Sequence, residues 1–407
     1  MKPNAILVRY AEVFLKRGRR GYFIGCLKDN LALQVRRAGP FKVREVHGFL
    51  LVVHADAQKD HLPELPDLPA LQEAVARTFG VVGYAACRLV PREISVLERE
   101  TAALADEDVA GAASFRVSAS RSDKAYPLDS MELNRRLGAI IAEKTGAPVR
   151  LRDPAVTVCC HILKTGAVLS LEDHPGPGGL PVGCSGRVAL LLSGGLDSPV
   201  AGWLAMRRGC ILDAIHFEAA PYTTPEARGK VEDLARLLAR HERALRLYVV
   251  PFGGIQAALR EGAPGPLLVV LYRRMMMRIA SRIAAACGAS ALVTGENLGQ
   301  VASQTLTNLG VIEDAADRPV LRPLLTYDKM ETVAFARRIG TYPISIRPYD
   351  DCCSLFVPPH PETAADLAVV RGVEARFPVD RWVDEATAAT EVLEFSGDDR
   401  EDQERAS

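Results

Sequence analysis

Residues 190–199 read Leu-Leu-Leu-Ser-Gly-Gly-Leu-Asp-Ser-Pro, and they combine the residue types that bind a phosphate group. The apolar run 188–192 predicts a buried strand, and Ser198 followed by Pro199 predicts a helix start with Ser198 as the N-cap. Glycines let the backbone approach an anion, and the N–H groups of a helix N-terminus are free to bind it. The common loop G-x-x-x-x-G-K-[ST] does not occur in the chain. The stretch therefore predicts a phosphate-binding loop of another type, with an ordinary Gly-rich turn as the alternative.

Asp197 lies inside this loop, where its carboxylate would repel a phosphate group. Mg²⁺ is held in proteins by phosphate oxygens together with one or two carboxylates. The sequence therefore predicts that Asp197 is a magnesium ligand next to the phosphates. The alternative is an Asp that caps the helix.

Two further segments carry groups suited to a nucleotide. Residues 294–300 end a predicted strand with a Gly-bearing turn and lead on to Gln304, which predicts a second nucleotide-contacting loop. Lys329 opens a predicted helix, where a cation opposes the helix dipole. That local penalty suggests a role elsewhere, such as stabilising charge on a phosphate in the transition state.

Arg274, Arg278 and Arg282 are spaced one helical turn apart and share one face of a predicted helix. A row of arginines suits phosphate binding, in a nucleotide or in a nucleic acid. Surface charge is the alternative.

Nine cysteines without a C-x-x-C pair give little support for a zinc or iron–sulfur site. Cys352 and Cys353 stand together in a turn-rich segment between Pro348 and Pro358. Loop cysteines are candidates for nucleophilic or sulfur-carrying chemistry. The neighbouring acids would raise a thiol pKa, so two inert cysteines remain the alternative.

A β-α-β-α pattern follows residue 188 and predicts a parallel sheet with helices on both faces. The predicted strands are 188–192, 212–217, 245–252, 291–294 and 320–323, and the predicted helices are 199–208, 225–241, 267–287 and 328–339. Ligands bind such sheets beyond the carboxyl ends of the strands. The loop at 193–198 lies at such an end, and so do His216 and Phe217. The aromatic ring of Phe217 could line an adenine pocket.

The sequence pattern before residue 173 predicts smaller α+β domains that are separated by Pro-rich linkers. We expect an N-terminal domain at 1–60, a second domain at 61–172, the α/β domain at 173–395 and an acidic, disordered tail at 396–407. Strands are predicted at 5–8, 49–53, 83–89, 114–120, 155–163 and 167–171, and helices at 20–33, 71–78 and 130–146.

The charge is unevenly distributed although the net charge is zero. Residues 1–50 hold eleven Lys or Arg against three Asp or Glu, a balance of +8, which predicts contact with a polyanion. A solvated basic face is the alternative. No apolar stretch is long enough to span a membrane, and no signal peptide is recognised, so a cytoplasmic protein is expected.

The loop resembles the PP-loop of ATP pyrophosphatases, and the chain from about residue 5 to 365 resembles the tRNA 4-thiouridine synthetase family. The resemblance rests on motifs at 9–12, 115–119, 129–135, 176–183, 192–201, 272–278, 294–296 and 299–305. It implies a ferredoxin-like domain, a THUMP domain and a PP-loop domain, of which the first two bind tRNA. It also implies ATP as cosubstrate, bound by loop residues Ser193, Gly194, Gly195 and Ser198 and by Leu191, Leu192, His216, Phe217, Arg273, Gly295 and Gln304.

The same resemblance implies roles in catalysis. Asp197 and Lys329 match residues needed for adenylation, and Cys352 matches the cysteine that takes part in sulfur transfer. ATP would adenylate O4 of uridine 8 in tRNA, and a persulfide sulfur from a cysteine desulfurase would then attack C4. Because such a uridine must leave the tRNA fold, a separate RNA-binding module is useful. A sulfur-carrier protein of thiamine biosynthesis is a second expected partner, and homodimerisation is left open.

The chain departs from some family members, whose C-terminal rhodanese domain carries the persulfide. The residues after Pro361 are too few for that domain and contain no cysteine. Either Cys352 or Cys353 then carries the sulfur, or an external protein presents it directly. Two other readings remain: another PP-loop tRNA-modifying enzyme of the 2-thiolating or lysidine type, and an RNA-binding protein with a vestigial nucleotide site.

Overall fold

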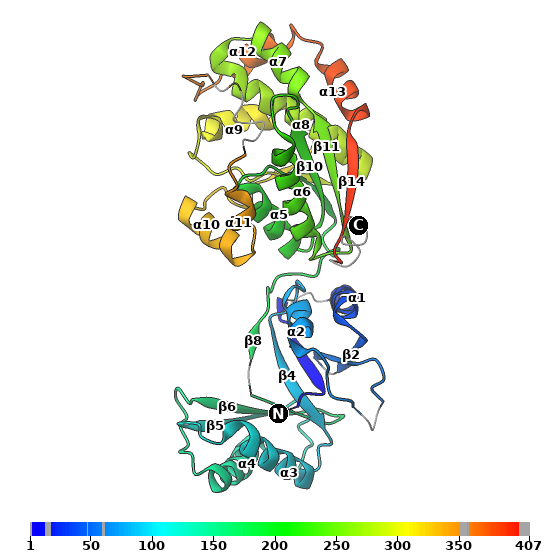
Figure 1. The fold of residues 1–407 in the computed structure, drawn as a ribbon, viewed down its shortest axis with the longest axis vertical. Coiled ribbons are helices and arrows are strands. Elements are labelled where there is room, and N and C mark those ends of the chain that lie inside the picture. The colour runs from blue at the N-terminus through cyan, green and yellow to red at the C-terminus, as the bar shows by residue number, and fades with distance from the viewer. Residues whose placement is uncertain are drawn as a thin grey trace. The chain divides into compact units, whose positions relative to one another are not determined.

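The computed structural model describes residues 2–12, 18–46, 48–58, 62–171, 173–349, 356 and 358–398. The chain divides into two compact units, an N-terminal unit of residues 1–181 and a C-terminal unit of residues 182–407 (Figure 1). In the described part of the chain, no helix has the length and apolar character needed to cross a membrane.

One sheet runs through the whole N-terminal unit. Its strands are β1 (Ala5–Arg9), β2 (Phe41–Val46), β3 (Phe49–His54), β4 (Gly83–Val90), β5 (Phe115–Arg121), β6 (Val156–Ile162), β7 (Ala167–Ser170) and β8 (His174–Pro175). They lie in the order β2-β3-β1-β4-β7-β6-β5, and β8 pairs with β4. The helices are α1 (Arg20–Ala38), α2 (Leu68–Ala76), α3 (Ile94–Leu104) and α4 (Ser130–Thr145). Strand β2 and helix α3 were not predicted from the sequence.

Strand β4 joins the parts that we expected to be separate domains. It pairs with β1 on one side, where Ile6 lies opposite Ala86, and with β7 on the other. β8 also pairs with β4, through Tyr84 and His174. Residues 173–181 therefore belong to the N-terminal unit, and the division falls after residue 181 rather than after residue 172.

Helix α4 shows why the sequence pattern was informative in this unit. The Asp129 side chain accepts a 2.8 Å hydrogen bond from the Glu132 backbone N–H and caps the helix. Leu133, Leu137 and Ile141 are buried at four-residue spacing, which places them on one face. The helix ends at Gly146 in the left-handed conformation.

The C-terminal unit contains a six-stranded sheet in the order β13-β12-β9-β10-β11-β14. The strands are β9 (Arg187–Leu191), β10 (Ile211–Glu218), β11 (Ala244–Pro251), β12 (Ala291–Val293), β13 (Val320–Leu321) and β14 (Glu391–Ser396). All pairings are parallel except that of β14 with β11. The five predicted strands are therefore confirmed. β14 was not predicted, and it ends at Ser396, the residue at which we expected the tail to begin.

Helices pack on both faces of this sheet. They are α5 (Asp197–Arg207), α6 (Pro225–Ala239), α7 (Gly253–Gly262), α8 (Leu268–Cys287), α9 (Leu306–Glu313), α10 (Lys329–Arg338), α11 (Tyr342–Ser345), α12 (Leu367–Glu374) and α13 (Val379–Ala388). Ala189 and Ile215 lie in the core cluster that contains α8. Leu190 and Leu212 face α5, so closely that a Cβ on Gly202 would lie 2.6 Å from Leu190 Cδ2. Neighbouring residues of a strand thus face opposite helical layers, as the parallel-sheet prediction requires.

Candidate functional site

A pocket opens at the carboxyl ends of β9, β10 and β12. Its lining is formed by Leu191, Leu192, Ser193, Gly195, Asp197, Ser198, Ile215, His216, Phe217, Arg273, Met276, Thr294, Gly295, Glu296 and Gln304. Every residue that we expected to bind ATP is among them except Gly194, which lies in the same loop between two lining residues. Lys329, expected to act on a phosphate, is also not part of the lining. This is the position at which parallel sheets bind ligands.

The Ser-Gly-Gly loop is closed by hydrogen bonds between its two serines. The Ser193 backbone N–H donates to Ser198 Oγ at 2.9 Å, and Ser198 Oγ donates to the Ser193 carbonyl at 3.2 Å. Helix α5 begins at Asp197 with Leu196 at the N-cap position and no side-chain cap. The prediction that Ser198 caps the helix is therefore wrong, because its hydroxyl is used to hold the loop in shape.

The second predicted loop touches the first one directly. A Cβ built on Gly295 would lie 2.6 Å from the Ser198 backbone nitrogen and 2.7 Å from the Asp197 carbonyl carbon. Backbone atoms cannot yield as a flexible side chain does, so this contact requires glycine. The structure brings together two loops that are about a hundred residues apart in the sequence.

Two polar side chains of the pocket lining are His216 and Gln304. The imidazole Nδ1 of His216 lies 3.1 Å from the Leu192 carbonyl, which ties the end of β10 to the end of β9. Gln304 is 6% exposed, and its buried Oε1 has no hydrogen-bond partner among the described residues. An unpaired buried acceptor in a pocket wall is suited to a ligand that donates a hydrogen bond.

Arg273 is held in the pocket by a buried carboxylate. Its Nη1 donates to Glu296 Oε1 at 3.2 Å, and Glu296 also accepts from Thr294 Oγ1 and from Arg322 Nε, at 2.9 and 2.8 Å. Burial lowers the pKa of Arg322, but Glu296 and Glu313 outweigh that effect and raise it above its ordinary value. Pairing with carboxylates of this kind offsets the cost of placing a charged guanidinium in a site that is partly shielded from water.

Asp197 and Lys329 meet at the mouth of the pocket. Lys329 Nζ lies 3.0 and 3.2 Å from the two carboxylate oxygens of Asp197, and Gln300 Nε2 donates to Asp197 Oδ2 at 3.1 Å. The helix of Lys329 begins with a capping box made by Asp328 and Glu331. These two acids offset the unfavourable position of a cation at a helix N-terminus.

The donor set for a metal ion at this place is small. Within the described residues, no three His, Cys, Asp or Glu side chains are arranged so that they could hold a metal. Asp197 is a single carboxylate, and it is paired with Lys329. Such a site fits Mg²⁺ only if phosphate oxygens supply most of the ligands.

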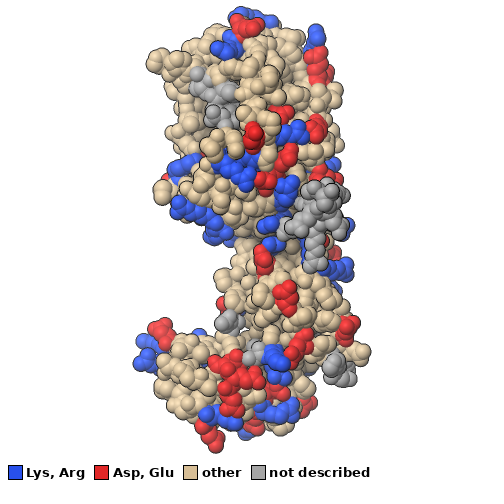
Figure 2. Space-filling view, in the orientation of Figure 1, with Lys and Arg blue, Asp and Glu red and all other residues tan. Residues whose placement is uncertain are grey.

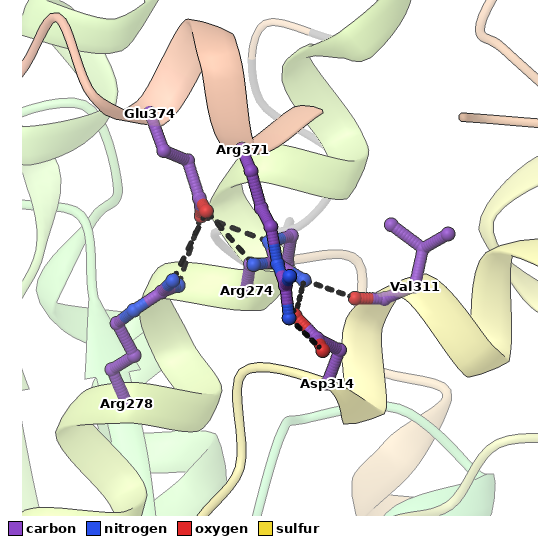
Figure 3. Close-up of polar contacts among 6 residues, drawn as sticks. All are labelled: Arg274, Arg278, Val311, Asp314, Arg371 and Glu374. Carbon is purple, nitrogen blue, oxygen red and sulfur yellow. Dashed lines mark hydrogen bonds and ion pairs between the residues drawn. The ribbon is translucent and has the colours of Figure 1, made fainter. Parts of the chain in front are cut away.

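The predicted row of phosphate-binding arginines on α8 is wrong. Arg274 and Arg278 pair with Glu374 of α12 (Figure 3). Arg282 pairs with Asp384 of α13. Their partners are carboxylates of the same unit, which the spacing of the arginines could not reveal because the acids lie about a hundred residues away.

Cys352 and Cys353 lie outside the described residues. The chain before them is fixed by Lys230, whose Nζ donates to the carbonyls of Arg347 and Tyr349 at 3.0 and 3.4 Å. Ser345 Oγ donates to the Gly195 carbonyl at 3.1 Å, which ties the same part of the chain to the Ser-Gly-Gly loop.

Three residues of the site were missed as site residues by sequence reasoning. Glu296 orients Arg273, Gln300 contacts Asp197, and Ser345 contacts Gly195. Glu296 and Gln300 stand in the segment 294–300 that was singled out, but nothing local distinguished them from their neighbours. Ser345 had no signal, because its contact bridges 150 residues.

Comparison with known proteins gives a consistent result for every part of the chain. The model of the thiamine biosynthesis protein family (ThiI) matches residues 183–379, that of the THUMP domain residues 91–172, and that of the ThiI ferredoxin-like domain residues 5–85. The probable tRNA sulfurtransferase of Moorella thermoacetica is 43% identical over 96% of this chain and 97% of its own. That of Thermus thermophilus is also 43% identical, over 97% and 95% of the two chains.

A solved structure is similar over almost the full length. It is a 4-thiouridine synthetase in complex with RNA and with bound ATP, with a TM-score of 0.87 and 33% identity over 96% of this chain and 99% of that one. The fold and the site thus define an α/β protein of the PP-loop class that carries ferredoxin-like and THUMP domains. Within that class, the chain belongs to the tRNA sulfurtransferase (ThiI) family.

Proposed function

We propose that this chain uses ATP to convert uridine 8 of tRNA to 4-thiouridine. The observation that carries the proposal is the contact of Lys329 with Asp197 at the mouth of the pocket formed by the Ser-Gly-Gly loop. An anion-binding loop, a cation and a carboxylate at one place are the groups that phosphate activation needs.

The pocket lining supports ATP as the cosubstrate. Phe217 and Met276 offer an apolar wall for a base, and the unpaired Gln304 Oε1 is placed to accept a hydrogen bond from the exocyclic amino group of adenine. The backbone of the loop 193–195 and Arg273 would contact the phosphates. The similar 4-thiouridine synthetase was solved with bound ATP.

The reaction would begin with attack of uridine O4 on the α-phosphorus of ATP, with pyrophosphate as the leaving group. Lys329 lies where it can stabilise the charge that develops on the phosphate oxygens. A persulfide sulfur then attacks C4 and AMP leaves, and a second thiol cleaves the S–S bond so that the sulfur remains on C4. We propose Cys352, or its neighbour Cys353, as a carrier of that sulfur.

Mg²⁺ would supply charge neutralisation between ATP and Asp197 when it is bound. The Asp197 carboxylate already accepts hydrogen bonds from Lys329 and Gln300, so it would have to bind the metal in addition to, or in place of, these two side chains. Both contacts are at the exposed mouth of the pocket, so the side chains have room to rearrange.

Charge near the pocket supports tRNA as the substrate. Figure 2 shows Lys and Arg side chains gathered over the region of α10 and α11. Helix α10 alone contributes Lys329, Arg337 and Arg338. A basic surface beside a nucleotide pocket is suited to the phosphate backbone of an RNA. In the N-terminal unit, basic residues such as Arg36 and Arg37 at the end of α1 are separate candidates for tRNA contacts.

A cysteine desulfurase is the proposed persulfide donor, and a thiamine-pathway sulfur-carrier protein is a further proposed acceptor. Homodimerisation stays a prediction that the oligomeric state in solution would test.

The test is a reconstituted thiolation assay. The protein is incubated with unmodified tRNA, magnesium and ATP, and with either sulfide or a cysteine desulfurase and cysteine. The expected result is the absorbance of 4-thiouridine together with release of AMP and pyrophosphate. Absence of thiolated tRNA with both sulfur sources, at a protein concentration that binds tRNA, would overturn the proposal.

A further inference from the structure

Arg274 carries a buried charge that no step of the proposed reaction uses. Its side chain is fully buried, and it is the largest fully buried side chain among the described residues. A buried guanidinium is costly unless every nitrogen has a partner. Figure 3 shows that its partners come from two other helices.

All three guanidinium nitrogens of Arg274 are used. Nε and Nη2 donate to the two oxygens of Glu374 on α12, at 2.9 and 2.8 Å. Nη1 donates to Asp314 Oδ2 at 3.1 Å and to the Val311 carbonyl, both at the end of α9. Arg274 thereby joins three helices, α8, α9 and α12.

The two carboxylates have further arginine partners. Arg278 donates to both oxygens of Glu374 at 2.9 and 3.0 Å. Arg371 donates to Asp314, with its shorter contact at 2.6 Å. Burial raises the pKa of Asp314, but the bonds from Arg371 and Arg274 outweigh burial and hold it below the ordinary value. Arg278 and Arg371 therefore hold the carboxylates of Glu374 and Asp314 in place independently of Arg274.

The residues that precede Arg274 on α8 and Asp314 at the end of α9 belong to a second set of ion pairs, which reaches the nucleotide pocket. Arg273 contacts Glu296, Glu296 contacts Arg322, and Arg322 contacts Glu313 at 2.5 Å. Arg273 and Arg274 on α8 are therefore connected to Glu313 and Asp314 on α9 by two separate chains of ion pairs. Successive residues of a helix point about 100° apart, so the two chains together define the rotation of α8 about its axis.

The helices that Arg274 joins also build the pocket wall. Helix α8 supplies Arg273 and Met276, and Gln304 stands directly before α9. The start of α9 is fixed because Thr305 Oγ1 accepts a 3.1 Å hydrogen bond from the Asn308 backbone N–H. A change in the placement of α8 against α9 would therefore change the distance between Arg273 and Gln304.

We propose that Arg274 is a positioning residue for the nucleotide pocket: its bidentate contact with Glu374 and its bonds to α9 set the separation of Arg273 from Gln304. The proposal rests on the proposed ATP site. Replacing a buried ion pair by apolar side chains of similar size is often neutral for stability or even stabilising. The specific contribution of Arg274 is therefore geometric, since a planar fork fixes direction in a way that an apolar side chain does not.

The test compares three variants of the full chain with the wild type. Arg274→Met removes the guanidinium, and Arg274→Met with Glu374→Leu removes both members of the buried pair, so that neither is left buried alone. Arg278, which loses Glu374 in the double variant, is 26% exposed, and Asp314 keeps its bond from Arg371. Arg282→Met is the matched control, because Arg282 lies on the same helix and pairs with Asp384 at the exposed surface. KM and kcat for ATP are measured by AMP release, and the melting temperature is measured by calorimetry.

The double variant decides the question even if Arg274→Met alone does not fold. We expect it to melt near the wild-type temperature but to show a KM for ATP raised by about tenfold or more, with a smaller change in kcat. Arg282→Met should leave KM within about twofold of wild type. A wild-type KM in the double variant, or an equal rise in Arg282→Met, would overturn the proposal. A wild type that releases no AMP would instead contradict the proposed function.

Discussion

At the scale of single residues, the contact between Lys329 and Asp197 is the most consequential, because it joins side chains 132 residues apart. We predict that Lys329→Met lowers kcat for tRNA-dependent AMP formation about 10²–10³-fold, since a preorganised cation at a developing charge contributes that much. ATP binding, measured by equilibrium dialysis, should change far less.

Lys329→Arg is the informative companion variant. It keeps the positive charge but changes its shape, so an intermediate kcat is expected. If Lys329→Met retained more than about a tenth of wild-type kcat, a role for Lys329 in stabilising the transition state would be refuted.

The adjacent cysteines give a second prediction at this scale. We expect Cys352→Ala to lose desulfurase-dependent thiolation while still forming AMP, because adenylation precedes sulfur transfer in the proposed reaction. Cys353→Ala should keep part of its activity and is the matched control. Thiolation is measured by 4-thiouridine absorbance, and the reverse ranking of the two variants would assign the sulfur carrier to Cys353.

At the scale of elements, the approach of residues 294–296 to the start of α5 constrains the sequence most strictly. We predict that Gly295→Ala lowers kcat/KM for ATP about 100-fold, because the added Cβ meets backbone atoms of Asp197 and Ser198 at under 3 Å and must displace the loop. The measurement is steady-state AMP release at several ATP concentrations.

Gly254→Ala is the control for this change. Gly254 lies in helix α7, and a Cβ there would meet no atom within 4 Å. That variant should be fully active and about 0.4–1 kcal/mol more stable, because alanine restricts the unfolded chain. Wild-type kinetics in Gly295→Ala would show that the two loops can separate without consequence.

Elements with a complete local signal could be predicted from the sequence, and the others could not. The strand that ends at Leu191 is an apolar run, and α4 carries its own cap, apolar face and terminal glycine. β14 is largely exposed and its residues are polar as often as apolar, so only its pairing with β11 identifies it as a strand. Local signals describe what a segment can form, whereas an edge strand depends on a partner far away in the sequence.

The same limit applies to the site. The loop residues and Asp197 could be selected because strand, turn and helix follow one another directly. Arg274 was misassigned because its row of arginines is visible in the sequence, but Glu374 and Asp314 are not recognisable as its partners. Burial of a charge is a tertiary property, which spacing along one helix does not report.

At the scale of the whole molecule, one buried acid makes stability depend on pH. Burial raises the pKa of Glu242 well above its ordinary 4.5, and the nearby Asp213 raises it further. The folded state then binds a proton that the unfolded state has already lost, so the free energy of unfolding falls as pH rises above about 4.5.

We therefore predict that Glu242→Gln is stabilising relative to wild type at about pH 8 and less so at about pH 5. Glutamine has the shape of the protonated acid but cannot ionise. The measurement is the free energy of unfolding by urea at both pH values, with the exposed Glu394→Gln as the control. A stabilisation that is equal at both values would contradict the assigned protonation of Glu242.

The continuous sheet of the N-terminal unit has a consequence for how the protein is made. β1 leaves the ribosome before β4, and one of its edges is covered only when β4 has been synthesised, some eighty residues later. Until then that edge exposes unpaired N–H and C=O groups beside apolar side chains such as Leu7. We expect that β-sheet association between nascent chains on neighbouring ribosomes competes with folding at that stage. Slowing translation before residue 90 should then raise the aggregated fraction of newly made protein, measured by sedimentation.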